Sequence, residues 1–128
     1  IFDPIKNEMF YAEKNNGAFL NNKRIRVSKK INIEECLFAT SGKNKKQIDF
    51  SYRKSGSAAL DMAYVACGRY DGYFQKNLHL WDIAAGIIIV KEAGGMINEI
   101  NLNNHKDIEI IASTPDINSK LIKKITNF

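Results

Sequence analysis

The feature that most constrains the fold is the segment from Ile83 to Val90, in which every residue is apolar or glycine. It follows the acidic residue Asp82 and ends shortly before the pair Gly94-Gly95, so the pattern predicts a helix that stops at these glycines. A helix that is apolar on all sides has no face suited to water, and we expect it to be buried. Other elements must surround it, and 128 residues are enough for a single domain, residues 1–128, with such a core.

Helices and strands alternate through the second half of the chain. The segment 56–68 is predicted to be a helix capped by Ser57 and ended by Gly68. The segment 116–126 is predicted to be an amphipathic helix opened by Thr114-Pro115. Alternating or β-rich patterns predict strands at 71–75, 96–100 and 107–113.

The first half is richer in strand patterns. Strands are expected at 8–12, 24–28 and 36–40, with turns at Asn16-Gly17 and Asn21-Asn22 that indicate a hairpin or short meander. The lysine-rich stretch 41–50 is more typical of a solvated loop than of an anion-binding one. Together the elements favour an α/β fold, an α+β layered sandwich in which helices flank one mixed sheet.

Composition excludes several classes of function. No run of 18 apolar residues is present, so no membrane span is expected. Cys36 and Cys67 lie in separate apolar stretches, which favours packing as small hydrophobes in a reducing cytoplasm over a disulfide or a metal site. The net charge of +5 comes from scattered lysines rather than a basic cluster, so nucleic-acid binding is not expected.

Asp82 raises the main functional question. A carboxylate in the first turn of a helix is stabilised by the free backbone N–H groups and the positive end of the helix dipole, so capping alone explains it. Alternatively, Asp82 could bind a hard cation such as Mg²⁺, which takes oxygen ligands. One carboxylate is a plausible contributor to a metal site but not a complete site, and residue spacing alone does not choose between the two roles.

The stretch WDIAAGIIIVKEAGG, residues 81–95, resembles the C-terminal signature of the inositol monophosphatase family. The similarity continues in GSAALDMAYVACGRYDGYFQ, residues 56–75, and in DPIKNEMFYAEKNNGAFLNNKRIRVS, residues 3–28. The resemblance implies the layered fold of inositol and sugar phosphatases. It also implies Mg²⁺-dependent hydrolysis of inositol monophosphate or a similar small phosphate monoester, without a covalent intermediate.

The resemblance also implies site residues. Asp82 would bind one metal ion and touch the substrate, and Gly56, Ser57 and Ala58 would open a helix that lies against the substrate, where backbone N–H groups suit oxyanions. Gln75 matches a position where inositol-specific members often have Glu bonded to a ring hydroxyl. Gln can still accept a hydrogen bond through its carbonyl, but it adds donors and loses the charge, which argues against inositol specificity.

Most of the family's catalytic groups belong to an N-terminal half that this chain does not match. Asp3-Pro4-Ile5 resembles the metal-binding motif D-P-I/L-D-G-S/T, but Lys6-Asn7 follows, so it matches a later segment of the family. The passage from Ser41 to Arg53 is also shorter than in the family, which could expose apolar surface. We therefore expect the C-terminal portion of such a phosphatase, with no complete catalytic set and with Mg²⁺ bound only beside the missing ligands.

Two functions remain open at this level. The chain could be an enzyme piece that associates with an N-terminal half, or a catalytically inactive remnant that acts as a protein-interaction or dimerisation domain, since family members are commonly homodimers. His79 precedes Asp82 by three residues, but Mg²⁺ prefers oxygen, so packing or hydrogen bonding is expected of it. His105 is expected in a loop.

Overall fold

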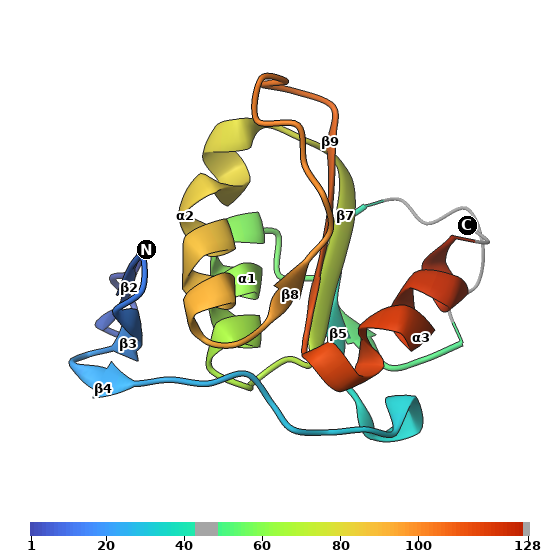
Figure 1. Ribbon diagram of the computed structural model, residues 1–128, viewed down its shortest axis with the longest axis horizontal. Coiled ribbons are helices and arrows are strands. Elements are labelled where there is room, and N and C mark those ends of the chain that lie inside the picture. The colour runs from blue at the N-terminus through green and yellow to red at the C-terminus, as the bar shows by residue number, and fades with distance from the viewer. Residues whose placement is uncertain (43–48, 127–128) are drawn as a thin grey trace.

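The computed structural model describes residues 1–42 and 49–126 and forms layers of sheets and helices (Figure 1). One sheet contains four antiparallel strands in the order β1 (Phe2–Asp3), β2 (Glu8–Glu13), β3 (Gly17–Leu20) and β4 (Lys23–Arg24). The other contains five strands in the order β6 (Tyr52–Arg53), β5 (Phe38–Ala39), β7 (Gly72–Leu78), β9 (Ile108–Ser113) and β8 (Met96–Ile97). The helices are η1 (Ile33–Glu35), α1 (Ala58–Ala66), α2 (Leu80–Glu92) and α3 (Pro115–Ile125).

The mixed α/β class is confirmed, but the prediction of one central sheet is wrong. The five-stranded sheet is mixed, because β5 runs parallel to β6 and β7 whereas β7, β9 and β8 are antiparallel. The four N-terminal strands instead form their own antiparallel sheet, since tight turns join them. After β4 the chain leaves this sheet, and the Val27 N–H donates to the Ala93 carbonyl at the end of α2, at 3.1 Å.

Helices α1 and α2 lie between the two sheets, and α3 covers the opposite face of the five-stranded sheet (Figure 1). One hydrophobic core surrounds α1 and α2, and a second lies between the five-stranded sheet and α3. Gly86 permits the close approach of the two central helices. A Cβ atom at this position would lie 2.8 Å from the Cβ of Met62 on α1 and 2.7 Å from its Sδ.

The expectation that the helix around 83–90 is buried on all sides is only partly met. Ile83, Ile89 and Val90 are buried, but Ala84 and Ala85 on the same helix are exposed. The four-stranded sheet packs on part of α2 and leaves the rest of its apolar surface open. None of the helices in the described residues is long and apolar enough to cross a membrane.

Several predicted elements are confirmed with different bounds. Helices α1 and α3 lie within 56–68 and at 115–125, and Gly68 has the left-handed φ of +79° that ends α1. The strand expected at 24–28 is only Lys23–Arg24, because only these two residues pair with the neighbouring strand β3. Strand β7 is longer than expected, whereas β5 and β8 are shorter.

The passage from Ser41 to Arg53 lies partly outside the described residues. The lysines at 43, 45 and 46 belong to the part that is not described. After it, Phe50 packs on Phe38, with ring centroids 4.7 Å apart, and on Phe74, at 6.0 Å. Phe38 and Phe74 are both buried. The short passage therefore does not leave these two apolar side chains exposed, because an aromatic side chain covers them.

Candidate functional site

Asp82 lies in the first turn of α2 and caps it reciprocally with His79. The Asp82 N–H donates to the His79 carbonyl at 3.0 Å, and the His79 N–H donates to Asp82 Oδ2, also at 3.0 Å. The cap thus uses one carboxylate oxygen. In the described part of the chain Oδ1 has no hydrogen-bond partner, and the side chain is 37% exposed. Capping and cation binding are therefore compatible at Asp82, because they use different oxygens.

The start of α1 contains the three residues predicted to face a ligand: Gly56, Ser57 and Ala58. Ser57 is the N-cap, as predicted, and its Oγ accepts from the Leu60 N–H at 3.3 Å. The Ser57 N–H donates to the Ser55 hydroxyl at 3.1 Å, so this amide is already engaged. In the described residues the free amides of this first turn are those of Ala58 and Ala59, which have no intrahelical acceptor.

Gln75, on β7, is half-buried and already bonded. The buried Tyr73 hydroxyl donates to Gln75 Oε1 at 2.6 Å. Burial, together with the charges of Asp61 and Asp82, raises the pKa of Tyr73, so the phenol keeps its proton. The Gln75 carbonyl therefore already accepts one hydrogen bond, and its second lone pair and the amide NH₂ are left for a ligand, so the substrate contact of Gln75 stays a prediction.

The acidic residues whose charges raise the pKa of Tyr73 show which parts of the fold lie near its hydroxyl. Both Asp61 on α1 and Asp82 on α2 act on the Tyr73 hydroxyl, and Tyr73 bonds Gln75. The starts of α1 and α2 therefore converge on the Gln75 side of β7. Two of the predicted residues, Gln75 on β7 and Asp82 on α2, are thus connected with the same Tyr73 hydroxyl.

Asp61 was not predicted from the sequence. It is fully buried in the first turn of α1, and its Oδ1 accepts from the Ser55 hydroxyl at 2.6 Å. Its Oδ2 has no hydrogen-bond partner among the described residues. The only signal was a lone acid within an apolar helix pattern, which a capping role also explains.

The remaining polar candidates have structural partners. The His79 ring stacks on Trp81, with centroids 4.4 Å apart, and the His105 carbonyl accepts from the Leu80 N–H at 3.0 Å. Asp3 Oδ1 accepts from the Ile5 N–H at 3.0 Å and the Lys6 N–H at 3.3 Å, which is the geometry of a turn between β1 and β2. Asp3 is thus engaged by its own turn.

Both cysteines are free thiols, and both pKa values are raised by burial, that of Cys36 to about 11. Neither is activated as a nucleophile at neutral pH. Cys36 is buried and Cys67 half-buried, as expected for small packing residues.

The donor set around Asp82 fits one ligand position for Mg²⁺ and no more. Among the described residues, no three His, Cys, Asp or Glu side chains lie close enough to hold a metal ion together. Mg²⁺ demands six oxygen ligands, and one carboxylate oxygen supplies one of them. Further protein ligands would have to come from outside the described residues.

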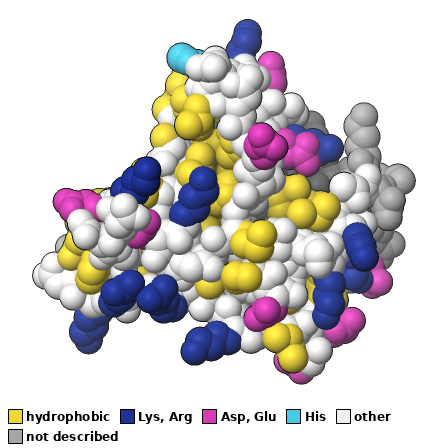
Figure 2. Space-filling view, viewed as in Figure 1, with side chains coloured by type: hydrophobic (Ala, Val, Ile, Leu, Met, Phe, Trp, Pro, Cys, Tyr) yellow, Lys and Arg dark blue, Asp and Glu magenta, His cyan; other side chains and the backbone are white. Residues whose placement is uncertain are grey.

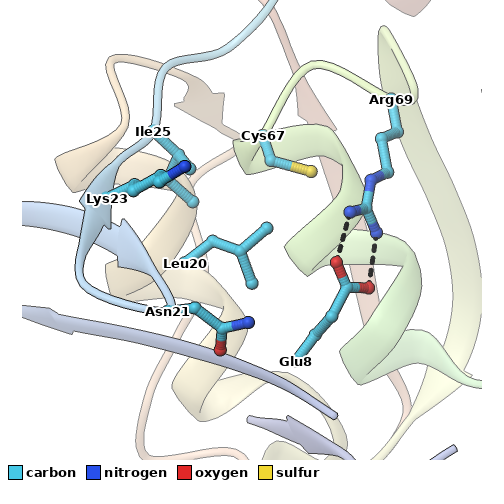
Figure 3. Close-up of a pocket in the computed structure, with 7 residues that line it drawn as sticks. All are labelled: Glu8, Leu20, Asn21, Lys23, Ile25, Cys67 and Arg69. Carbon is cyan, nitrogen blue, oxygen red and sulfur yellow. Dashed lines mark hydrogen bonds and ion pairs between the residues drawn. The ribbon is translucent and has the colours of Figure 1, made fainter. Parts of the chain in front are cut away.

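A separate pocket of about 380 Å³ lies at the other end of α1 (Figure 3). Its walls include the ion pair of Arg69 with Glu8, and Cys67, the C-cap of α1, points into it (Figure 3). The pocket is lined by Glu8, Leu20, Asn21, Lys23, Ile25, Cys67 and Arg69. The nine residues of α1, about 14 Å of helix, separate it from Ser57. It contains none of the predicted site residues.

The surface shows how charge and apolar groups are distributed. On the face in Figure 2, Lys and Arg side chains are dispersed among other residues, and hydrophobic side chains gather over α2 and the neighbouring strand β8. Trp81, at the start of α2, is 73% exposed. This face lacks a basic patch of the kind that nucleic-acid binders use.

The chain belongs to the inositol monophosphatase family, whose sequence model matches residues 1–127. It is 33% identical over 143 aligned positions to the inositol-1-monophosphatase of Caulobacter vibrioides, covering 97% of this chain and 56% of that protein. It is 36% identical to the Nus factor SuhB of Pasteurella multocida, covering 98% of this chain and 53% of that protein.

The fold is also that of the family. The crystal structure of the extragenic suppressor protein suhB from Bartonella henselae matches with a TM-score of 0.84 and 39% identity, over 98% of this chain and 56% of that one. The chain therefore spans about half the length of the relatives it matches. The Caulobacter alignment extends over 143 positions, more than the 128 residues here, so that relative carries residues that this chain lacks.

Proposed function

We propose that this chain forms the C-terminal half of a Mg²⁺-dependent phosphatase for small phosphate monoesters, such as inositol or sugar phosphates. The observation that carries the proposal is the Asp82 carboxylate, which caps α2 with one oxygen and leaves the other for a cation. The nearby amides of Ala58 and Ala59 would meet the phosphate oxygens. Bound Mg²⁺ would neutralise phosphate charge and activate water.

By itself the chain would not turn over substrate. One carboxylate does not hold two metal ions, and the other ligands would come from a complementary N-terminal polypeptide. The chain covers 56% of the Caulobacter relative, so the uncovered part of that protein is a suitable source of such a polypeptide. Association with that half would complete the metal site, and a homodimer of the completed protein would follow the family.

The metal role of Asp82 is tested with Mn²⁺, which shares the oxygen preference of Mg²⁺ and broadens nearby amide resonances. In the ¹⁵N-labelled chain, we expect low Mn²⁺ to broaden Asp82, Ile83 and Ala58 first. Asp82→Asn should weaken this effect about tenfold, because a neutral amide replaces the anionic ligand. Adding the uncovered N-terminal polypeptide of the Caulobacter relative should strengthen Mn²⁺ binding further.

Asp116→Asn is the matched control, since Asp116 is an exposed acid in the first turn of α3. It should leave the broadening at Asp82 unchanged. If Mn²⁺ broadens the starts of α2 and α3 equally, and both substitutions act alike, Asp82 is a helix cap and the proposed function fails.

Substrate choice is predicted from the free amide NH₂ of Gln75. This donor favours a ligand group that only accepts hydrogen bonds, so 3-phosphoglycerate, with a carboxylate, should bind more tightly than glycerol 3-phosphate, with hydroxyls. A hydrogen bond between a neutral and a charged group suggests a preference of roughly fivefold. Gln75→Glu should reverse it. Chemical-shift titration in the presence of Mg²⁺ measures both affinities.

Asn77→Asp provides the control, because it makes the same chemical change at an exposed position two residues along β7. It should leave the ratio of the two affinities as in the unmodified chain. Equal responses to Gln75→Glu and Asn77→Asp would show a general effect of charge and would exclude Gln75 as the residue that selects the ligand.

The second candidate function is a protein-interaction domain. It is favoured by the exposed Trp81 and the open apolar side of α2, and one relative is named Nus factor SuhB. Binding through this surface would be weakened by Trp81→Ser but would not depend on metal or on Asp82. Complex formation that responds to Trp81→Ser alone would favour this function over the phosphatase.

A further inference from the structure

A chain of hydrogen bonds connects a buried acid to the ligand-facing start of α1. Asp61 Oδ1 accepts from the Ser55 hydroxyl at 2.6 Å, and the Ser55 Oγ accepts from the Ser57 N–H at 3.1 Å. The helix closes this loop, because the Asp61 N–H donates to the Ser57 carbonyl at 2.9 Å. The backbone of Ser57 is thus held from both sides by the same residue, once directly and once through Ser55.

The burial of Asp61 has a cost that its place in the first turn of α1 does not explain. Its side chain is fully buried, and Oδ2 has no hydrogen-bond partner in the described part of the chain. Burial raises the pKa of Asp61 to about 6, and the bond from Ser55 opposes this rise. An acid in the first turn needs neither burial nor an unpartnered oxygen, since an exposed carboxylate also interacts favourably with the helix N-terminus.

Burial and the hydrogen bond from Ser55 set the ionisation of Asp61, and no cation contributes to it among the described residues. The titratable groups that face it are Tyr70, in the turn after α1, and Tyr73 on β7, and the Asp61 charge raises the pKa of both phenols. Asp82 of α2 acts on the same Tyr73 hydroxyl. Ser55 is therefore the group through which the Asp61 carboxylate reaches the start of α1.

We propose that Asp61 is a positioning residue for the oxyanion-facing start of α1, acting through the Ser55 hydroxyl on the Ser57 amide. The inference rests on the proposed function, because it assigns a support to that ligand site. By engaging the Ser57 N–H, Ser55 fixes the turn that points the amides of Ala58 and Ala59 at a ligand. The ionised carboxylate accepts the stronger, charge-assisted bond, so ionisation of Asp61 tightens the turn.

The test follows the Ser57 and Ala58 amide resonances of the ¹⁵N-labelled chain from pH 5 to pH 8, and the affinity for sulfate. Sulfate is the oxyanion probe because its charge stays constant over this range. In the unmodified chain, the Ser57 amide should show an inflection near pH 6, the Asp61 pKa. Sulfate should bind about threefold more tightly above the inflection than below it, as expected for a strengthened hydrogen bond.

Three variants separate positioning from general electrostatics. Asp61→Asn should remove the inflection, while its side-chain oxygen can still accept from Ser55. Ser55→Ala should uncouple the Ser57 amide from Asp61 and weaken sulfate binding, and Ser55→Thr, which keeps a hydroxyl, should restore both. Asp116→Asn and Ser119→Ala, at exposed positions of α3, are the controls and should change neither readout.

Two results would overturn the inference. One is a Ser57 inflection that persists in Ser55→Ala, because Asp61 would then act through space. The other is sulfate binding that Ser55→Ala leaves unchanged, because the turn would then not need Ser55. If sulfate binds to no variant at all while the inflection persists, the proposed ligand site fails, and the inference that depends on it fails with it.

Discussion

Asp71→Ala is expected to lower the free energy of unfolding by about 3 kcal/mol, because it leaves three hydrogen-bond donors without their shared acceptor. Asp71 is 1% exposed. Its Oδ1 accepts from the Ser28 hydroxyl at 2.5 Å, and its Oδ2 accepts from the Leu37 N–H at 2.8 Å and from Lys30 Nζ at 3.1 Å. The carboxylate thus joins the connection after β4 to the start of β5.

Urea denaturation of the unmodified chain and of Asp71→Ala measures this loss of unfolding free energy. Lys30→Ala is the control, because Lys30 is half-exposed and its ion pair should contribute less than about 1 kcal/mol. The loss for Asp71→Asn should lie between those for Asp71→Ala and Lys30→Ala, since the Asn carbonyl oxygen can still accept from the Leu37 N–H. Equal losses for Asp71→Ala and Lys30→Ala would mean that the ion pair, and not the hydrogen bonds to backbone and hydroxyl, holds this connection.

Gly86→Val is also expected to lower the free energy of unfolding by about 3 kcal/mol, because the added side chain overpacks the contact of α1 and α2. A Cβ at Gly86 would lie 2.8 Å from Met62 Cβ, which no rotamer of Met62 can relieve. The two helices would have to separate. Because the starts of these helices carry Asp82 and the free amides of α1, the same variant should weaken Mn²⁺ binding.

Ala85→Val is the matched control, since it places the same side chain on the exposed side of the same helix. It reports the small loss due to the lower helix propensity of valine, about 0.5 kcal/mol. Thermal or urea unfolding of both variants gives the difference. If Gly86→Val and Ala85→Val unfold alike, the helices do not pack as closely as described, and the metal affinity should also stay unchanged.

The parts of the structure that local chemistry determines were predictable from the sequence. Ser57 and Gly68 mark the ends of α1 because capping and left-handed φ depend on neighbouring residues only. Asp82 was placed correctly in the first turn of α2 for the same reason. The family resemblance predicted the layered fold, because its motifs cover most of the chain.

Features that depend on side-chain orientation and on packing between elements were not predictable. The carbonyl of Gln75 already accepts one hydrogen bond because β7 buries Tyr73 beside it, and no pattern in the sequence orients an amide. The role of Asp61 depends on a serine six residues earlier, in an irregular turn. The exposed side of α2 was also missed, because hydrophobic periodicity shows which faces are apolar but not how much of them a neighbouring sheet covers.

The stacking of Trp81 on His79 places a built-in optical reporter at the proposed site. Trp81 is the only tryptophan in the chain, so its emission is not mixed with that of another indole. It is the residue before Asp82 and lies on the open side of α2. A cation at Asp82 would alter the charge beside the indole, whereas a polypeptide bound over α2 would remove it from water and shift its emission to the blue. One unlabelled sample can therefore distinguish metal binding from partner binding by colour and intensity alone.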